Sequence, residues 1–219
     1  EENHAFRLFT VGSVSFKMIF VEGGKFKMGS PDNDSEAFDD EKSLHDVTLG
    51  DYYIGETQVT QALWQAVMDN NPSVFQGENN PVDSVSWVMC QAFIKKLNSI
   101  TGQNFHLPTE AEWEFAARGG KKSQDYKYAG RNRIDEVAWY ENNSGSKTHP
   151  VKQKRANELG LYDMSGNLME WCQDLYGSNR VLRGGSWNSD ARRCRTVNRS
   201  SGNPDKDYDI DIFGFRLAL

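Results

Sequence analysis

The stretch LPTEAEWEFAARGG, residues 107–120, carries a full set of helix signals. Thr109 and Glu112 have the spacing of a capping box, in which each side chain bonds a backbone N–H at the start of the helix. Glu110, also in the first turn, is favoured there by the helix dipole. Gly119 stands where a left-handed residue commonly ends a helix. The sequence therefore predicts a short helix that begins after Thr109 and stops at Gly119.

Other predicted elements surround this helix, with long loops between them. Helices are expected where apolar residues recur at helical spacing, and strands where apolar and polar residues alternate. So few elements in a chain of 219 residues indicate a loop-rich α+β protein. The predicted helices are 60–70, with Leu63, Trp64 and Val67 inward, and 86–102, with Cys90, Phe93, Ile94 and Leu97 inward. The predicted strands lie within 6–30, 47–60, 180–187 and 213–219, and loops are expected over 120–160.

Composition excludes several classes of protein. A hydrophobic fraction of 37% is enough for a core, and the length fits one domain over residues 1–219. The net charge of -6 argues against nucleic-acid binding, which requires a basic surface. The sequence has no run of about 18 apolar residues, so it predicts no transmembrane segment. Cys90, Cys172 and Cys194 lack zinc-site spacing, and the first two are predicted to be buried free thiols.

Five motifs occur in a specific order: GGKFKMGS from Gly23, LPTEAEWEFAARGG, GLYDMSGNLMEW, RGGSW and a terminal GFRLAL. Together they resemble the formylglycine-generating-enzyme, or sulfatase-modifying-factor, superfamily. The resemblance extends from Gly23 to Leu219. It implies an α+β, loop-rich variant of the C-type lectin fold, with a small antiparallel sheet and two or three short helices. Within that fold, Gly184 and Gly185 would form a tight turn beside bulky core residues.

The resemblance also indicates that the family's oxidase chemistry is absent. Family enzymes use two cysteines spaced C-x4-C, whose thiolates bind copper. Counted back from Arg199, those positions are Ala191 and Thr196 in this chain. Cys194 is displaced by two residues, and one thiol cannot form a two-thiolate site. We therefore predict that the protein is not an enzyme, with a formylglycine-generating-enzyme-like oxidoreductase or sulfatase-maturation relative as the alternative.

No cofactor is required by this interpretation, but the resemblance implies a Ca²⁺ site within YDMSGNLMEW. Side-chain oxygens of Asp163 and Glu170 and backbone carbonyls of Gly166 and Leu168 would be its ligands, a set that suits Ca²⁺. The residues fit a second interpretation equally well, in which Asp163 and Asn167 cap a tight turn and Glu170 pairs with an arginine. A second family calcium site is predicted to be lost, because Ala138 replaces its asparagine.

The polar segment WNSDARRCRTVNRSSGNPDKDYD, residues 187–209, resembles the variable region of proteins diversified by retroelements. In that family a reverse transcriptase alters adenines, and asparagine codons are the favoured targets. Such changes cannot produce Glu, Gln, Met, Trp or Lys. From Asn188 to Ile212 the sequence has no Glu, Gln, Met or Trp, and Lys206 is its one lysine. The composition therefore agrees with a variable region over about 187–212.

The predicted function is ligand binding by this variable region, displayed on an otherwise fixed scaffold. The ligand is expected to be a protein. The family implies a cell-surface or secreted location, in some members with a lipid anchor. An accessory protein without a diversified site is a further alternative. Asn188, Arg199 and Pro204 are expected to hold the loop, and the predicted outward, ligand-binding residues are Ser189, Asp190, Arg192, Arg193, Arg195, Val197, Ser200, Ser201, Asp207 and Tyr208.

Overall fold

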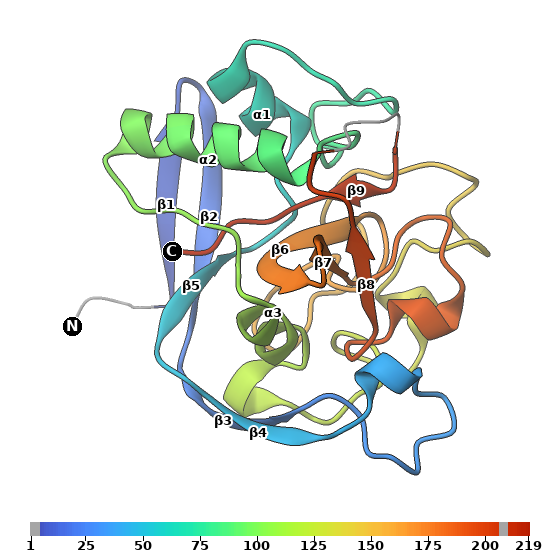
Figure 1. Cartoon of the computed structure of the whole chain (residues 1–219). Coiled ribbons are helices and arrows are strands. Elements are labelled where there is room, and N and C mark those ends of the chain that lie inside the picture. The colour runs from blue at the N-terminus through green and yellow to red at the C-terminus, as the bar shows by residue number, and fades with distance from the viewer. Residues whose placement is uncertain (1–4, 206–209) are drawn as a thin grey trace.

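The computed structural model describes residues 5–205 and 210–219 (Figure 1). Its first sheet is antiparallel and has the strand order β1-β2-β5. β3 and β4 form a separate antiparallel pair, and the loop of residues 29–44 that connects them contains the short 3-10 helix η1. These elements are β1 Phe6–Val11, β2 Val14–Val21, β3 Gly24–Met28, η1 Asp39–Glu41, β4 His45–Leu49 and β5 Tyr52–Gly55.

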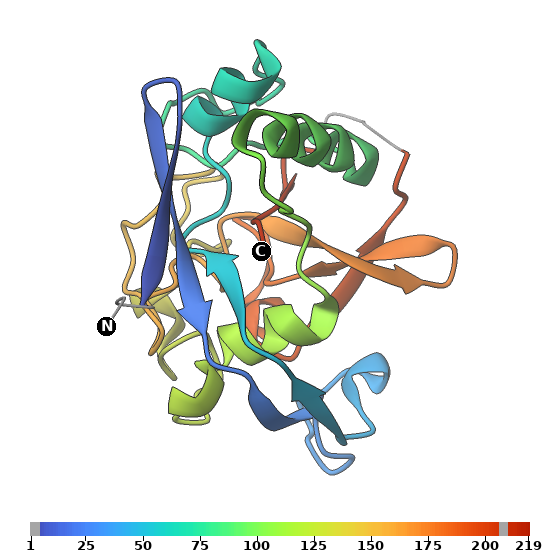
Figure 2. The same cartoon turned by 90° about the vertical axis from the view of Figure 1, so that its left-hand side faces the viewer.

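The α-helices of the described residues begin after capping side chains, Thr60, Ser86 and Thr109, of which the cap at Thr109 was predicted. They are α1 Gln61–Met68, α2 Trp87–Thr101 and α3 Glu110–Ala117. Thr109 and Glu112 form the predicted capping box, and Gly119 has the predicted positive φ, +95°. Figure 2 shows α1 and α2 together at one end of the molecule, with α3 closer to its middle.

The third sheet has the order β8-β7-β6-β9 and carries the C-terminal motifs. Its strands are β6 Met169–Tyr176, β7 Asn179–Arg183, β8 Arg199–Gly202 and β9 Phe213–Gly214. β6 and β9 are parallel, so this sheet is mixed where an antiparallel sheet was expected. The strand predicted over 213–219 is also shorter than expected. Its last residues instead bond irregularly to neighbouring backbone, for example Gly55 N–H to the Leu217 carbonyl (2.8 Å).

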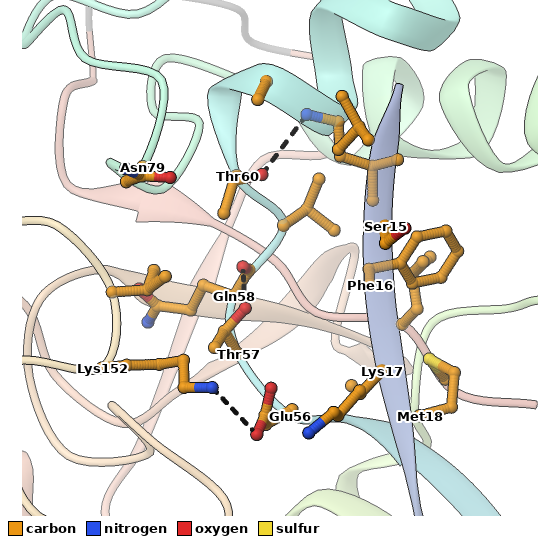
Figure 3. Close-up of a pocket in the computed structure, with 17 residues that line it drawn as sticks. Ser15, Phe16, Lys17, Met18, Glu56, Thr57, Gln58, Thr60, Asn79 and Lys152 are labelled. Atoms are coloured by element: carbon orange, nitrogen blue, oxygen red, sulfur yellow. Dashed lines mark hydrogen bonds and ion pairs between the residues drawn. The ribbon is translucent and has the colours of Figure 1, made fainter. Parts of the chain in front are cut away.

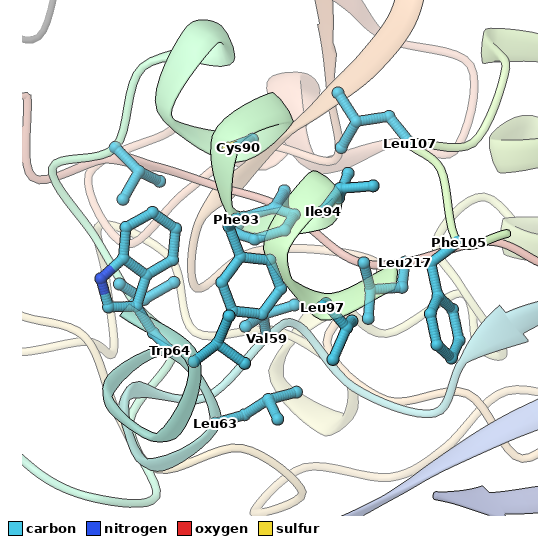
Figure 4. Close-up of a cluster of buried hydrophobic side chains, with 14 of the residues drawn as sticks. Val59, Leu63, Trp64, Cys90, Phe93, Ile94, Leu97, Phe105, Leu107 and Leu217 are labelled. Carbon is cyan, nitrogen blue, oxygen red and sulfur yellow. The ribbon is translucent and has the colours of Figure 1, made fainter. Parts of the chain in front are cut away.

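The largest hydrophobic cluster joins α1 and α2 to the C-terminal tail (Figure 4). Trp64 stacks on Phe93 with ring centroids 5.1 Å apart, and the ring of Phe215 meets both edge-on. The predicted inward residues Cys90 and Leu97 are fully buried in the same cluster. Helical periodicity thus identified the faces of α1 and α2 correctly.

Residues 120–160 form loops, as predicted, with two short 3-10 helices: η2 Gly120–Lys122 and η3 Ile134–Glu136. Side chains fix these loops to regular elements. Asn157 donates from Nδ2 to the Ala116 carbonyl at the end of α3 (2.8 Å), and Tyr140 is buried. Within the described residues, no helix is both long and apolar enough to cross a membrane.

Candidate functional site

The polar segment begins at a turn that only glycine accommodates. After β7, Gly184 and Gly185 have φ values of +97° and +70°. A Cβ on Gly184 would lie 3.0 Å from Trp113 Cζ2, and one on Gly185 would lie 2.7 Å from Cys194 Sγ. Both positions therefore exclude a side chain by conformation and by space. The turn confirms the role predicted for these glycines and leads the chain into residues 187–202.

A short 3-10 helix, η4 Ala191–Cys194, forms the centre of the segment. Asp190 caps it by accepting a hydrogen bond from the Arg193 N–H (2.9 Å). Cys194 points inward and is fully buried among apolar residues that include Val137 and Ala138. Burial raises the pKa of its thiol. With Cys194 inward, Arg192 and Arg193 are exposed. The Arg192 guanidinium also donates to the Glu36 and Ala37 carbonyls, at 2.6 and 3.3 Å, and lies over the ring of Phe38.

Most of the predicted ligand-binding residues within the described chain reach the surface. Arg192 and Arg193 are exposed, and four others are partly exposed: Asp190, Val197, Ser200 and Ser201. Asn188, which was expected to hold the loop, is exposed as well, although its side chain accepts a hydrogen bond from Ser186 Oγ (2.8 Å). The outward residues of this surface are Asp190, Arg192, Arg193, Val197, Ser200 and Ser201. We call these six side chains the outward set.

Two predicted positions do not face solvent. Ser189 is buried because its Oγ accepts a hydrogen bond from the Ser186 N–H (2.9 Å) and its carbonyl accepts one from the Glu141 N–H (3.0 Å). Arg195 is buried because it forms an ion pair with Glu41. The expectation of outward side chains is therefore wrong for Ser189 and Arg195. Predicted residues Asp207 and Tyr208 lie outside the described residues.

Glu41 of η1 is the anchor of the segment and was not identified from sequence. Its carboxylate accepts two hydrogen bonds from Arg195, at 2.9 and 3.0 Å, and one from Asn198 Nδ2 at 2.6 Å. It also accepts a hydrogen bond from the Phe38 N–H (3.1 Å), within its own loop. One buried carboxylate thereby joins the loop of residues 29–44, which is rich in acidic side chains, to residues 195–198. Glu41 stands in a run of acids, and sequence alone offers no signal that distinguishes it.

A second set of ion pairs fixes the start of β8 to α3. Arg199 bonds both oxygens of Glu110, at 2.6 and 2.8 Å, which agrees with its predicted role in holding the loop. Buried Arg183 of β7 bonds Glu114, also of α3. Glu110 was expected to act mainly on the helix dipole, and the structure adds an ion-pairing role to it. The backbone beneath the outward set is thus fixed by charges from outside the segment.

The positions that match the family's catalytic cysteines have no metal-binding chemistry here. Ala191 is half-buried against the cluster around Cys194, and Thr196 is buried. All three cysteines of the chain are free and buried, as predicted for Cys90 and Cys172. Among the residues that the structure describes, no group of three or more His, Cys, Asp or Glu is arranged to hold a metal ion.

The predicted calcium turn brings its oxygens together around an unpredicted residue, Gln58. Gln58 Nε2 lies 2.8 Å from the Leu168 carbonyl, 3.0 Å from Glu170 Oε1, 3.3 Å from the Asp163 carbonyl and 3.5 Å from the Gly166 carbonyl. Asp163 therefore contributes its carbonyl to this cluster. One oxygen of its carboxylate instead accepts a hydrogen bond from the Lys152 N–H (3.0 Å).

This oxygen cluster has more acceptors than donors. An amide nitrogen carries two hydrogens and cannot satisfy four oxygens. Gln58 Oε1 and Asp163 Oδ1 are also buried without a hydrogen-bond partner. Burial is the main cause that raises the pKa of Asp163 to about 6. Rotating the Gln58 amide by half a turn would place Oε1 among the other oxygens, and such a set fits a hard cation.

The alternative interpretation of the same turn is also partly realised. Glu170 pairs with Arg216, whose Nε and Nη2 donate at 2.7 and 2.8 Å. Asn167 exchanges two hydrogen bonds with the backbone of His149, both at 3.0 Å, and so joins the turn to the neighbouring loop. Arg216 therefore already balances the carboxylate charge of Glu170. The carbonyl oxygens around Gln58, in contrast, do not all have a hydrogen-bond donor.

Comparison with known proteins agrees with this geometry. Residues 11–219 match the family model described as "Sulfatase-modifying factor enzyme 1-like domain". The solved structure of Treponema denticola variable protein 1 is similar over 98% of both chains, with a TM-score of 0.86 and 36% identity. The chaperone protein LppX of Paenibacillus barcinonensis is 38% identical over 80% of both chains. The formylglycine-generating enzyme of Streptomyces coelicolor is 28% identical over 91% of this chain and 88% of its own.

Proposed function

The chain belongs to the sulfatase-modifying factor enzyme 1-like domain family, and from that premise we propose that it is a non-enzymatic protein that binds ligands through a diversified surface. The outward set would be the part that varies, and the rest of the chain would be a fixed scaffold. The observation that carries the proposal is the division within one segment between outward side chains and buried anchors. Likeness to a variable protein over 98% of both chains supports it.

The physical argument rests on where the segment obtains its stability. Arg195 and Asn198 bond Glu41, and Arg199 bonds Glu110, so the backbone is fixed by side chains that face inward. Substitutions at exposed positions away from such contacts usually change stability by less than about 0.5 kcal/mol. A surface of this design tolerates many sequences. A catalytic site does not, because a misplacement of about 1 Å can reduce a rate about 100-fold.

The alternative of an oxidoreductase is not favoured by the chemistry of the matching positions. Ala191 and Thr196 have no thiols, and the thiol of Cys194 is sealed in an apolar cluster. Copper-dependent oxygen consumption, measured with a cysteine-containing peptide, tests this alternative directly. We expect no consumption above that of copper and peptide without protein. Protein-dependent turnover would refute the non-enzymatic proposal.

Sequencing the locus in many isolates tests diversification at the level of single codons. We expect a neighbouring reverse transcriptase and a near-identical template repeat. Adenine-derived changes should concentrate at the codons of the outward set and spare those of Ser189, Arg195 and Asn198, whose side chains are buried. Changes spread evenly over residues 188–202, or a locus without a reverse transcriptase, would contradict the proposal.

The proposed ligand is a protein, and binding is proposed to take place outside the cytoplasm. A photo-crosslinking residue at Arg193 should capture a protein partner from the natural environment, and the same residue at exposed Lys25 on β3 provides the control. The proposed location is the cell surface or the extracellular medium, with or without a lipid anchor. Biotinylation of intact cells tests it. Labelling only after lysis, in cells that secrete none of the protein, would contradict this location.

We further propose that Ca²⁺ binds the turn around Gln58 and stabilises the scaffold. Gln58 Oε1, the carbonyls of Asp163, Gly166 and Leu168, and Glu170 Oε1 would be its ligands. The support is the surplus of buried acceptors there. A ligand at 100 times its Kd stabilises a fold by about 2.7 kcal/mol, which raises Tm measurably.

Thermal unfolding with Ca²⁺ or with a chelator tests the calcium proposal. Ca²⁺ should raise the Tm of the wild type and of the control Asp39→Asn, whose side chain is exposed, but not that of Gln58→Leu. Mg²⁺ should have a smaller effect, because it needs a tighter octahedral site. Equal effects of Ca²⁺ on wild type and Gln58→Leu, or none on either, would rule the site out.

A further inference from the structure

Strand β1 forms one edge of its sheet. The strand order is β1-β2-β5, so among the described residues β1 pairs with a strand on one side only. All six residues of β1 pair with β2. Figures 1 and 2 both show β1 at the outside of the molecule, on the side away from β8. An edge strand of this length presents backbone groups that can pair with a further strand.

The turn between β1 and β2 determines which backbone groups of β1 are unpaired. Val11 and Val14 flank the two-residue turn 12–13 and lie opposite each other. In such a hairpin the flanking pair is hydrogen-bonded, and along β1 every second residue then bonds β2. The residues of odd number therefore direct their N–H and C=O groups to β2. The Phe20 N–H, which donates to the Ala5 carbonyl (3.0 Å), agrees with this alternation.

Phe6, Leu8 and Thr10 therefore direct their backbone N–H and C=O groups away from β2. These groups have no backbone hydrogen bond to any other part of the described chain. The side chains of Phe6 and Leu8 are 44% and 59% exposed. Leu8 lies opposite Lys17 of β2, whose ammonium is 4.9 Å from the centroid of the Phe6 ring. Figure 3, a view of the pocket beside β2, shows Lys17 on the opposite side of the strand from Phe16. Phe16 packs against the main hydrophobic cluster, so the face that carries Leu8 points away from that cluster.

A second copy of β1, running antiparallel, matches this edge when the two-fold axis passes between the two Leu8 residues. Leu8 then lies opposite Leu8, and Phe6 lies opposite Thr10 of the second copy. Every outward residue of β1 thereby enters a hydrogen-bonded pair, and each such pair exchanges two backbone hydrogen bonds. The exposed Leu8 side chains meet at the axis, which removes apolar surface from water in both copies. The edge is therefore self-complementary, as a symmetric dimer requires.

Charge selects this register over its neighbours. In the Leu8-centred register Arg7 lies opposite Phe9 of the second copy, and it already lies 4.9 Å from the Phe9 ring of its own chain. A shift of two positions in one direction places Arg7 opposite Arg7, and like charges directly opposite each other are destabilising. The same shift in the other direction places Phe9 opposite Phe9 and leaves the backbone groups of Phe6 without a partner. One register therefore pairs all the free groups without opposing cations.

We propose that two copies of this chain associate through β1 in the Leu8-centred register and join their three-stranded sheets into one. A single strand from each copy supplies most of the contact, and interfaces below about 1,200 Å² are typical of weak, transient association. The dimer is therefore expected at high local concentration. Because β1 lies away from β8, pairing leaves β8 uncovered in both copies. The inference does not depend on the proposed function of the outward set.

Sedimentation velocity of the purified protein measures the association. Between about 10 µM and about 1 mM, a range suited to transient partners, the mean sedimentation coefficient should rise toward that of a dimer. Leu8→Lys places two ammonium groups face to face and should weaken association at least about tenfold. Leu175→Lys is the matched control, because Leu175 is 64% exposed on β6, and it should leave the association unchanged. A wild type that stays monomeric over this range, or equal weakening in both variants, would overturn the proposal.

Hydrogen exchange followed by ¹⁵N–¹H NMR locates the interface. At low protein concentration the amides of Phe6, Leu8 and Thr10 should exchange rapidly, because β2 does not bond them. At about 1 mM their exchange should slow by at least about threefold, while the amide of Phe9, which bonds β2 in both states, serves as the internal reference. A dimer in which these three amides stay unprotected would use a different surface and would contradict the proposal.

Cysteine cross-linking tests the register. The Cα atoms of a hydrogen-bonded antiparallel pair lie about 5.5 Å apart, within the range of about 4.4–6.8 Å that a disulfide spans. Leu8→Cys should therefore form a covalent dimer under mild oxidation, visible on a non-reducing gel, because the three native cysteines are free and buried. Thr10→Cys is the control and should cross-link far more slowly, since Thr10 lies opposite Phe6. Equal cross-linking of the two variants, or none with Leu8→Cys, would refute the register.

Discussion

Arg195 and Glu41 form a buried ion pair with two hydrogen bonds, 2.9 and 3.0 Å long, across 154 positions of sequence. Their side chains are 3% and 0% exposed. The pair joins the polar C-terminal segment to the acidic loop that follows β3. The pair therefore holds the backbone between η4 and β8 from the inside, and Arg192 of the outward set adds hydrogen bonds to the Glu36 and Ala37 carbonyls of the same loop.

Loss of this pair should destabilise the protein far more than loss of a surface pair. Arg195→Ala leaves the carboxylate of Glu41 buried without its cation, and we expect the free energy of unfolding to fall by about 3–5 kcal/mol. Arg193→Ala is the matched control, because Arg193 pairs with Asp190 at 59% and 40% exposure. Arg193→Ala should lower the free energy of unfolding by at most about 1 kcal/mol. Urea unfolding measures both, and similar losses would contradict the anchoring role of Glu41.

Neighbouring residues of the segment should differ sharply in tolerance. Thr196 is 2% exposed, whereas Val197 next to it is partly exposed. Thr196→Asn adds volume at a buried position and should destabilise by about 1–3 kcal/mol. Val197→Asn should change stability by less than about 0.5 kcal/mol. If the two variants unfold at the same urea concentration, the division into buried and outward positions is wrong.

The turn after β7 should not accept alanine. Gly184 has a φ of +97°, and a Cβ there would lie 3.0 Å from Trp113 Cζ2. Gly177 in the β6–β7 turn has a φ of +62° with nothing within 4 Å, so Gly177→Ala isolates the conformational penalty, about 1–2 kcal/mol. Gly184→Ala should lower the free energy of unfolding by about 1–3 kcal/mol more than Gly177→Ala does, because the added methyl group also crowds the core. Thermal or urea unfolding of the two variants checks the difference.

The thiol of Cys194 should be unreactive in the folded protein. Burial raises its pKa, so little thiolate forms, and alkylating reagents have no access to it. We expect iodoacetamide labelling, followed by mass spectrometry, to be on the order of 100-fold slower than at a cysteine introduced by Val197→Cys. Rapid labelling of Cys194 would indicate an accessible thiol and reopen the enzymatic alternative.

Glu158 should make stability depend on pH. Both of its carboxylate oxygens are shielded and lack a hydrogen-bond partner, and burial is the main cause that raises its pKa. A raised folded-state pKa favours folding below the unfolded pKa, and this contribution is lost as pH rises through the folded value. Glu158→Gln cannot ionise and should lose less stability than wild type between about pH 4 and about pH 7. Urea midpoints at both pH values test this, and identical pH profiles would contradict it.

Local signals in the sequence were sufficient for much of the fold. Helix α3 follows from its capping box and from Gly119, and the buried faces of α1 and α2 follow from apolar periodicity. The parallel pairing of β6 with β9 was missed, because strand pairing depends on partners distant in sequence. Gln58 was missed for a related reason, since its contacts to the turn at 163–170 are made across more than 100 positions of sequence.

The order of the motifs in the sequence was sufficient to identify the family. The sequence also showed that Ala191 and Thr196 occupy the positions of the family enzymes' two cysteines, and its composition distinguished the polar segment from the rest of the chain. Only the tertiary structure decided which arginines of that segment face outward. Arg193 and Arg195 are chemically identical, and η4 is too short and irregular to impose a repeating pattern of burial. What separates them is Glu41, a buried carboxylate that requires a cation and lies within reach of Arg195 alone of these two.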